Sequence, residues 1–209
     1  MAMELRVLGD VEAWMEGRRM EVGHARQRCV LVVLVVDANR AVTVDQLLER
    51  VWSQEPPQRG RQALRSYLSR LRRLFSPAGV GIERRSNGYI LVADPDSVDL
   101  HLFRRVVADA RAADGEHALE LFEQALALWR GEPFAGLDTP WLATVRGRMR
   151  VVLLGTGSLS SLPQTGQRPI PMGGAGSDTR RPTSARWSRV RTPSAGQPGP
   201  AISVANAAR

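Results

Sequence analysis

The chain has 209 residues and a formal net charge of +8, and all 29 basic residues are arginine. This length accommodates one or two small domains. The charge is uneven, because residues 1–150 hold 22 arginines and 20 acids (net +2), whereas residues 151–209 hold 7 arginines and 1 acid (net +6). The extreme basicity therefore comes mostly from the C-terminal segment and does not by itself indicate a basic domain.

Several classes of protein find no support in the sequence. A chain without lysine cannot complete a P-loop, and the three histidines and single cysteine do not lie at metal-ligand spacing. We therefore expect no enzyme activity, no cofactor and no metal. A single cysteine suits a reducing cytosol, the N-terminus lacks a signal-peptide pattern, and the apolar run at residues 29–36 is too short to cross a bilayer. We expect a cytoplasmic protein without a membrane partner.

The first elements are expected to be short strands followed by a buried helix. Residues 4–22 alternate apolar and polar positions, with interruptions at Gly9-Asp10 and Glu16-Gly17, which predicts antiparallel strands. The β-branched run within residues 24–39 fits either a strand or a helix. We predict a fully buried helix, because its first turn is polar and it lies between a small sheet and a second helix. Thr43 is a good N-cap for that second helix.

Residues 57–75 are the most informative segment of the chain. At helical pitch, one arc of about 120° is apolar and the opposite arc is polar and basic. The apolar arc consists of Leu64, Tyr67, Leu68, Leu71, Leu74 and Phe75. The segment holds six arginines and no acid. A DNA recognition helix needs this division, since arginine binds guanine edges or phosphates; the alternative is a solvated basic face.

A basic hairpin is predicted directly after this helix. Residues 81–92 have strand character, with the turn expected at Asn87-Gly88 and with Arg84 and Arg85 just before it. The order helix, helix, basic helix, basic hairpin is that of a winged helix, whose wing can reach a minor groove or the adjacent phosphates. The alternative is an ordinary hairpin with solvated arginines. The order of the elements, with a basic helix directly before the hairpin, makes this alternative less favoured than the winged helix.

Two amphipathic helices are predicted at residues 98–114 and 116–130. Together they are similar to one tetratricopeptide-like unit, which normally stacks on others to bury its apolar face. The buried stripe of the second helix is expected to be Ala118, Leu119, Phe122, Ala125, Leu126 and Trp129. A third helix begins near Trp141, and its pattern is expected to fail at Gly147.

The composition changes from about residue 151, where Gly, Pro, Ser, Thr and Arg dominate. Such a stretch buries too little apolar surface to offset its chain entropy, so we expect disorder over residues 155–209. The predicted fold class is α+β: a winged helix-turn-helix with an N-terminal antiparallel sheet and a C-terminal hairpin wing, followed by a partial all-α tetratricopeptide-like unit and a disordered tail.

Residues 4–150 resemble the N-terminal part of the SARP family, the Streptomyces antibiotic regulatory proteins of actinobacteria. The segments that carry the resemblance are ELRVLGDVEAW, HARQRCVLVVLVVDANRAVTVDQLLERVW, PPQRGRQALRSYLSRLRRLF, RSNGYIL, VDLHLFRRVVADARA and ALELFEQALALWRGEPF. The resemblance implies an OmpR-type winged-helix DNA-binding domain at residues 1–95 and a partial α-helical bacterial transcriptional activation domain at residues 98–150. Residues 151–209 are then a disordered basic tail.

The resemblance also implies partners and a role. Family members bind direct repeats in promoters of secondary-metabolite gene clusters and recruit RNA polymerase, with dimeric or tandem binding on DNA. The activation domain of the family continues for several more helices, whereas here Gly147 and the tail follow. One hypothesis is a shift of reading frame near residue 147 that leaves a non-native tail.

The expected DNA-contacting residues are drawn from three places. On the basic helix, the candidates for base or phosphate contact are Gln62, Arg65, Ser66, Ser69, Arg70 and Arg73, with Arg61 and Arg72 expected to hold phosphates. Outside it, the candidates are Arg84 and Arg85 of the hairpin and Arg26 and Arg28 at the start of the first buried helix. The resemblance assigns Arg85, just before Gly88-Tyr89, to the minor groove.

We therefore predict a sequence-specific regulator of transcription that binds double-stranded DNA at the nucleoid. The resemblance makes it an activator of a secondary-metabolite (antibiotic) biosynthetic cluster. The competing class is a protein-interaction module that uses the helical surface of residues 98–146, with the winged helix as a scaffold. A further alternative is that the basic tail alone binds nucleic acid without sequence preference.

Overall fold

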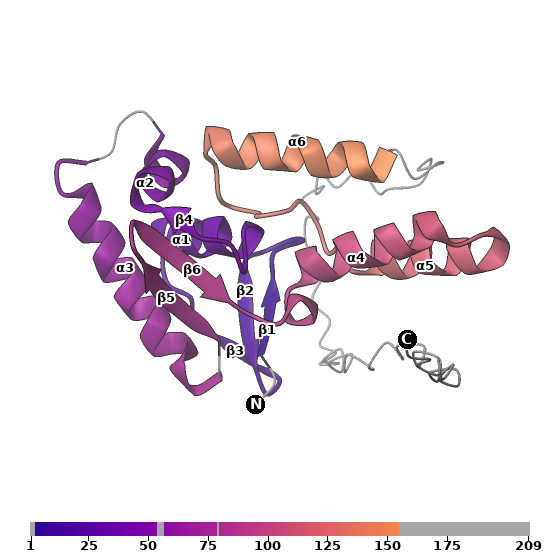
Figure 1. Ribbon diagram of the computed structural model, residues 1–209, viewed down its shortest axis with the longest axis horizontal. Helices are drawn as coiled ribbons and strands as arrows, with labels where there is room; N and C mark the ends of the chain where they lie inside the picture. Colours follow the sequence, from indigo (N-terminus) through magenta and orange to yellow (C-terminus); the bar gives the residue numbers. More distant parts are fainter. Residues whose placement is uncertain (1–2, 54–56, 79, 155–209) are drawn as a thin grey trace, which may run out of the picture. The chain divides into compact units, whose positions relative to one another are not determined.

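The computed structural model describes residues 3–53, 57–78 and 80–154, which form two small sheets and a set of helices around one apolar core (Figure 1). The disorder predicted over residues 155–209 falls outside the described residues. The structure matches the predicted fold class, a winged helix followed by a helical unit, and shows where the sequence misplaced particular turns and faces.

The chain opens with a three-stranded antiparallel sheet. Strand β1 (Met3–Arg6) pairs with β2 (Glu12–Met15), which pairs with β3 (Arg18–Met20). Between β2 and β3, Glu16 and Gly17 make a two-residue turn with φ of 50° and 77°. A two-residue hairpin turn that matches the twist of its strands requires positive φ at both of its residues when it is of type I′. The predicted short antiparallel strands are confirmed.

Helix α1 (Ala25–Val36) is buried on every side from Cys29 onward. Each residue from Val30 to Val35 is at most 1% exposed. A helix that is apolar all round has to be covered all round. Helices α2 (Val44–Trp52) and α3 (Gly60–Phe75) supply part of this cover, together with the second sheet. The prediction of a buried helix, rather than a strand, is confirmed.

A capping box begins α2 directly after the short strand β4 (Val42–Thr43). The Thr43 hydroxyl oxygen accepts from the Gln46 backbone N–H at 3.1 Å, and the Thr43 backbone N–H donates to Gln46 Oε1 at 3.0 Å. Such a cap contributes about 0.5–2 kcal/mol of helix stability. The predicted N-cap is confirmed, and it lets the chain turn from sheet to helix without an intervening loop.

The wing is a hairpin in a sheet of order β4-β6-β5. A 3₁₀ turn, η1 (Ser76–Ala78), follows α3 and leads to β5 (Gly81–Arg85) and β6 (Gly88–Val92). The predicted hairpin is confirmed, but the predicted turn is one residue too late. Arg85 pairs with Gly88, so the turn is Ser86-Asn87. Gly88 is needed for packing, because a Cβ there would lie 2.1 Å from the Val42 carbonyl oxygen.

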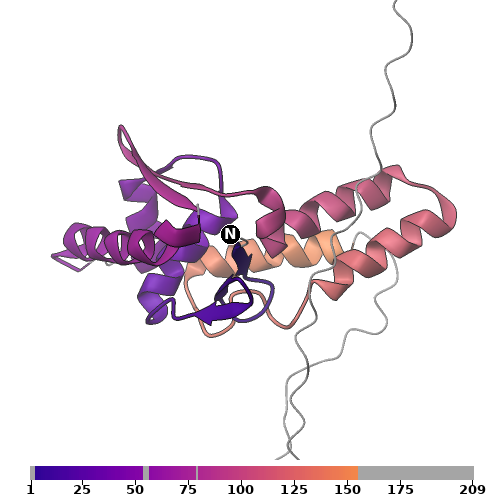
Figure 2. The ribbon, with the colours of Figure 1, turned by 90° about the horizontal axis from the view of Figure 1, so that it is seen from below.

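After η2 (Pro95–Ser97), α4 (Asp99–Ala112) and α5 (Gly115–Ala127) run side by side as a helical hairpin (Figures 1 and 2). The expected buried stripe of α5 is partly wrong. Ala125 is buried, but Leu119 is 60% exposed and Phe122 is only partly buried. The helical periodicity of the sequence identified the apolar face of α5. Burial of that face also requires another element to pack on it.

Helix α6 (Pro140–Leu154) runs through Gly147, so the predicted break of the helical pattern at that glycine is wrong. Leu142, Val145 and Met149 are 1%, 8% and 4% exposed and form a stripe that continues past the glycine. One glycine inside a helix costs about 1 kcal/mol relative to alanine, and burial of that stripe outweighs it.

A buried carboxylate fastens α4 to the first sheet. Asp99 is 3% exposed, and its oxygens accept from the backbone N–H of Val7 at 2.8 and 2.9 Å and of Leu8 at 3.0 Å. Arg130 Nη2 lies 3.0 Å from the same carboxylate. Burial raises the pKa of Asp99, and the two backbone N–H groups and Arg130 oppose that rise. The residues after 98 are thus attached to the winged helix by buried polar contacts.

His101 makes a second attachment, at the C-terminal end of α1. Its Nε2 lies 2.7 Å from the Val35 carbonyl oxygen. Burial lowers the pKa of His101 from its ordinary 6.5; Arg104 and Arg40 add to that lowering, whereas the Val35 carbonyl and Asp37 oppose it. The fold therefore favours the neutral ring over the protonated one.

We expect the free energy of unfolding to fall as the pH drops below about 6.5. The reason is that His101 takes up a proton more readily in the unfolded chain than in the folded one. His101→Gln, which keeps an N–H donor toward Val35, should flatten this part of the pH dependence. Urea unfolding at about pH 7.5 and 5.5 measures it, with the exposed His117→Gln as control. A pH difference that persists in His101→Gln would contradict the assignment.

Leu68 tests the core-facing side of α3. It is 0% exposed, and truncating a buried leucine costs about 2–5 kcal/mol. We expect Leu68→Ala to lower the free energy of unfolding by that amount. The neighbouring exposed Ser69→Ala should change it by less than about 0.5 kcal/mol. Equal stability of the two variants in urea unfolding would mean that the core face of α3 is wrongly assigned.

Candidate nucleic-acid interface

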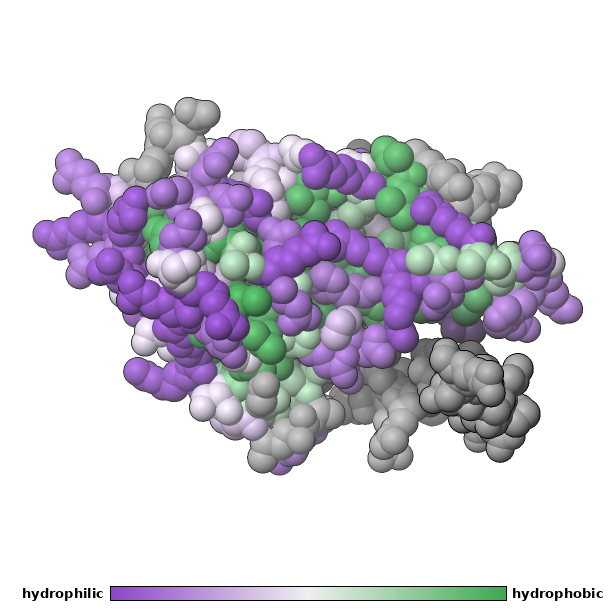
Figure 3. All heavy atoms as spheres, viewed as in Figure 1, coloured by the Kyte–Doolittle hydropathy of each residue, from purple (hydrophilic) through white to green (hydrophobic). Residues whose placement is uncertain are grey.

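Helix α3 has one face in the core and one in solvent. Leu64, Leu68, Leu71 and Phe75 are at most 1% exposed, and Tyr67 and Leu74 are partly buried against the core. The predicted apolar arc is confirmed. The opposite face is exposed along the helix, and it carries Gln62, Arg65, Ser66, Ser69, Arg70 and Arg73. Hydrophilic side chains cover this end of the molecule (Figure 3).

Most of the exposed face of α3 is free of internal partners. No hydrogen bond or ion pair joins the side chains of Arg65, Arg70 or Arg73 to another residue in the described part of the chain. The Ser66 hydroxyl donates to the Gln62 carbonyl oxygen at 3.1 Å, as serines on helices often do. The face thus presents unpaired guanidinium groups, which bind phosphate or guanine in bidentate fashion.

Arg61 and Arg72, predicted to hold phosphates, differ in their environments. Arg61 is 64% exposed and pairs with Asp45 of α2 at 2.7 Å. An exposed pair of this kind contributes about 0–1 kcal/mol, so a phosphate can displace the carboxylate. Arg72 is partly buried; its Nε donates to the Ile82 carbonyl oxygen at 2.6 Å, and its guanidinium lies 5.3 Å from the Tyr89 ring centre. Arg72 therefore has a role in holding the wing to α3 that the sequence did not predict.

The two arginines of the wing are exposed. Arg85 forms an ion pair of 2.7 Å with Glu83 on the same strand, both about half exposed. Arg84 has no ion-pair partner among the described residues, and it lies opposite Tyr89 in the strand register.

A hollow of about 270 Å³ lies between the start of α2, the first half of α3 and the wing tip. The arginines that line it are Arg61, Arg65 and Arg84. Asp45, Ser86 and Asn87 also line it, and none of the three was among the predicted DNA-contacting residues. The only signal for Asp45 was its place in the first turn of α2, where an acid is common at any helix start. The fold thus brings arginines of α3 and of β5 to the same hollow.

Arg26 and Arg28, at the start of α1, are less available than predicted. The Arg26 Nη1 donates to the Val51 carbonyl oxygen at 2.6 Å and so contacts the end of α2. Arg28 is partly buried, and its Nε is buried without a hydrogen-bond partner among the described residues. Their phosphate contacts stay a prediction, as do those of the other candidate residues.

Neither a membrane-spanning helix nor a metal-binding cluster occurs in the described part of the chain. No helix in this part of the chain is both long and apolar enough to cross a membrane. No group of three or more His, Cys, Asp or Glu side chains is placed there to hold a metal ion.

Two protein families match the chain in the order expected. Residues 21–91 match the family described as "Transcriptional regulatory protein, C terminal". Residues 98–156 match the family described as "Bacterial transcriptional activator domain". The first match contains α1 to α3 and most of the wing, and the second contains α4 to α6.

Several curated proteins are similar to the chain. Regulatory protein AfsR of Streptomyces coelicolor is 35% identical over 163 residues, which are 74% of this chain and 16% of that protein. Transcriptional regulatory protein MoaR1 of Mycobacterium tuberculosis is 31% identical over 139 residues, which are 62% of this chain and 45% of that protein. Transcriptional regulator RedD of S. coelicolor is 33% identical over 138 residues, 62% of this chain and 39% of that protein. The chain therefore spans less than half the length of each of these relatives.

The fold is similar to a solved structure of Mycobacterium tuberculosis EmbR in complex with a low affinity phosphopeptide. The TM-score is 0.68 at 28% sequence identity, over 74% of this chain and 43% of that chain. The two matched families, their order along the chain and the similarity to these regulators agree with the resemblance found in the sequence. The chain thus combines a region of the transcriptional regulatory protein C-terminal family with a region of the bacterial transcriptional activator domain family, and it is similar to transcriptional regulators such as AfsR and RedD, as the resemblance to the SARP family implied.

Proposed function

We propose that this chain is a sequence-specific regulator of transcription that binds double-stranded DNA with α3 in the major groove. The observation that carries the proposal is the division of α3 into a fully buried apolar face and an exposed face with three unpaired arginines. A major groove about 12 Å wide admits one α-helix, and bidentate arginine–guanine pairs are the commonest specific contacts in it. On this proposal Arg65 and Arg73 contact base edges, and Gln62, Ser66, Ser69 and Arg70 complete the contacts.

The wing extends the interface along the duplex. The Arg72 side chain joins α3 to the Ile82 carbonyl of β5, so helix and wing keep a fixed spacing. Arg84 shares a hollow with Arg61 and Arg65, and this hollow is suited to a backbone phosphate. Arg85 then lies nearer the turn, where it leaves Glu83 for the minor groove or a flanking phosphate.

The wider role follows from the family and stays a proposal. We infer an activator that binds promoter direct repeats, in tandem or as a dimer, in a secondary-metabolite gene cluster. The similarity of residues 98–156 to an activator domain supports a contact with RNA polymerase. The apolar Leu119, 60% exposed on α5, offers a contact point for such a partner. On this proposal the protein acts at the bacterial nucleoid, in the cytoplasm.

Base contacts by Arg65 and Arg73 can be tested with DNA that the full chain selects from a genomic fragment library. Each of Arg65→Ala and Arg73→Ala is expected to cost about 1–3 kcal/mol of specific binding, or roughly 5- to 150-fold in Kd. Fluorescence anisotropy with the selected duplex and with a scrambled duplex measures the effect. The matched control is Arg111→Ala, an equal change of charge at an exposed position of α4.

The same comparison separates the competing functions. All variants keep residues 155–209, so any non-specific binding by that segment is constant. Equal Kd values for the parent chain and both α3 variants would refute the placement of α3 in the groove. Equal losses on selected and scrambled DNA would assign the arginines to phosphates instead of bases. An absence of any selected fragment would favour the protein-interaction module.

Arg85→Ala is expected to lower the slope of log Kobs against log salt by about one, because a single phosphate contact releases about 0.9 of a counterion. Affinities measured between about 50 and 200 mM salt give the slope. Glu83→Gln removes the carboxylate that pairs with Arg85 and competes with DNA for it. This variant should bind DNA more tightly, an effect opposite to that of Arg85→Ala, and it serves as the control. An unchanged slope in Arg85→Ala would place Arg85 away from the DNA backbone.

A further inference from the structure

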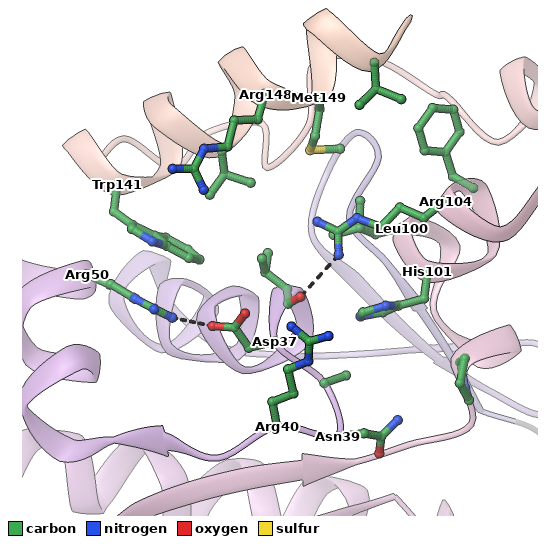
Figure 4. A pocket seen from close by; sticks show the side chains of 16 residues that line it. Asp37, Asn39, Arg40, Arg50, Leu100, His101, Arg104, Trp141, Arg148 and Met149 are labelled. Atoms are coloured by element: carbon green, nitrogen blue, oxygen red, sulfur yellow. Dashed lines mark hydrogen bonds and ion pairs between the residues drawn. The ribbon is translucent and has the colours of Figure 1, made fainter. Parts of the chain in front are cut away.

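A cavity of about 550 Å³ is lined by residues of α1, α2, α4 and α6 (Figure 4), and no residue of α3 lines it. This volume is within the range of about 300–1,000 Å³ that small-molecule sites occupy. Its walls come from both matched regions, since Arg40 and Arg50 belong to the winged helix and Arg104 and Arg148 to the helical part. A molecule bound there would contact both.

The lining of the cavity carries an excess of positive charge. Four arginines line it, and Asp37 is the one carboxylate among the lining residues. Asp37 is already paired with Arg50, whose guanidinium also lies 4.9 Å from the Trp141 ring centre. Arg104 Nη1 is 3.4 Å from the Val36 carbonyl oxygen, a long contact.

Two of these arginines have no internal partner. No hydrogen bond or ion pair joins the side chain of Arg40 or Arg148 to another described residue. Burial lowers the pKa of Arg104, and that of the lining His101 is lowered as well. Arg104 is therefore partly desolvated, whereas Arg40 and Arg148 are exposed cations at the rim of the same cavity. The lining holds more cations than anions, and a bound anion would offset this excess.

The remaining wall is apolar. Leu100, Phe103 and Met149 are 0%, 1% and 4% exposed, and they line the same cavity as the partly buried Trp141. A cavity with one apolar wall and a few convergent cationic groups is the usual form of a site for an amphipathic ligand.

We propose that this cavity binds a small organic anion, with its phosphate or carboxylate held by Arg40 and Arg148 and its apolar body against Leu100, Met149 and Trp141. The ligand bridges the winged helix and α6, and so it stabilises their packing against each other. This site is separate from the proposed DNA interface, and it does not depend on DNA binding.

Isothermal titration calorimetry of the full chain with 1-naphthyl phosphate and with 1-naphthoate tests the proposal. Saturable binding of at least one of them is expected, and the two probes show which anionic group the site prefers. Binding of 1-naphthol, which lacks the anion, and of inorganic phosphate, which lacks the apolar body, should be weaker by about tenfold or more. A neutral probe or bare phosphate that binds as tightly as the amphipathic anions would overturn the proposal.

Variants locate the site. Arg40→Gln and Arg148→Gln should each weaken binding of the anion by about tenfold. Arg111→Gln, an exposed arginine of α4 outside the cavity, should leave it unchanged. Unchanged binding in both cavity variants would mean that the anion binds elsewhere, for example at the arginines of residues 155–209, and would also overturn the proposal. Because the substituted arginines are exposed, each variant is expected to fold, and its far-ultraviolet circular dichroism verifies this.

Discussion

The structure depends on one constraint: α1 has no polar face and must be covered on every side. Its residues from Val30 to Val35 are at most 1% exposed. Helices α2 and α3 and the wing sheet cover it within the winged helix, and α4 approaches its C-terminal end. The last carbonyls of a helix need donors once water is excluded. His101 and Arg104 of α4 reach Val35 and Val36 there, so the burial of α1 also brings the helical part onto the winged helix.

The same packing decides which side chains of α3 reach solvent. Because one face of α3 is fixed against the core, the opposite face points its arginines to solvent as a set, and the wing is held beside it by the Arg72 contact with Ile82. A rigid helix with a fixed neighbour reads DNA more selectively than a flexible basic segment would, since its backbone is already ordered and only side chains lose freedom on binding. This separates the proposed role of α3 from the non-specific attraction that any arginine-rich segment has for phosphates.

The helical part that follows residue 98 packs against the winged helix through buried polar contacts. Asp99 binds backbone N–H groups of Val7 and Leu8, and Arg130 pairs with the same carboxylate. The partly charged, partly apolar cavity lies along this junction and uses side chains of both matched regions. An anion bound there would act on the contact between the winged helix and the helical part, which is a suitable place for a small molecule to influence the proposed regulator.

The sequence by itself determined most of the elements and the apolar face of α3. The heptad-like spacing of Leu64, Leu68, Leu71 and Phe75 and the cap at Thr43 are local properties, and both were predicted correctly. Only the tertiary structure decided the rest. The role of Gly88 depends on the approach of Val42, the contact of Arg72 depends on where β5 lies, and the exposure of Leu119 depends on the lack of a covering helix among the described residues. Each of these depends on residues distant in the sequence, and periodicity records which face is apolar without recording what will cover it.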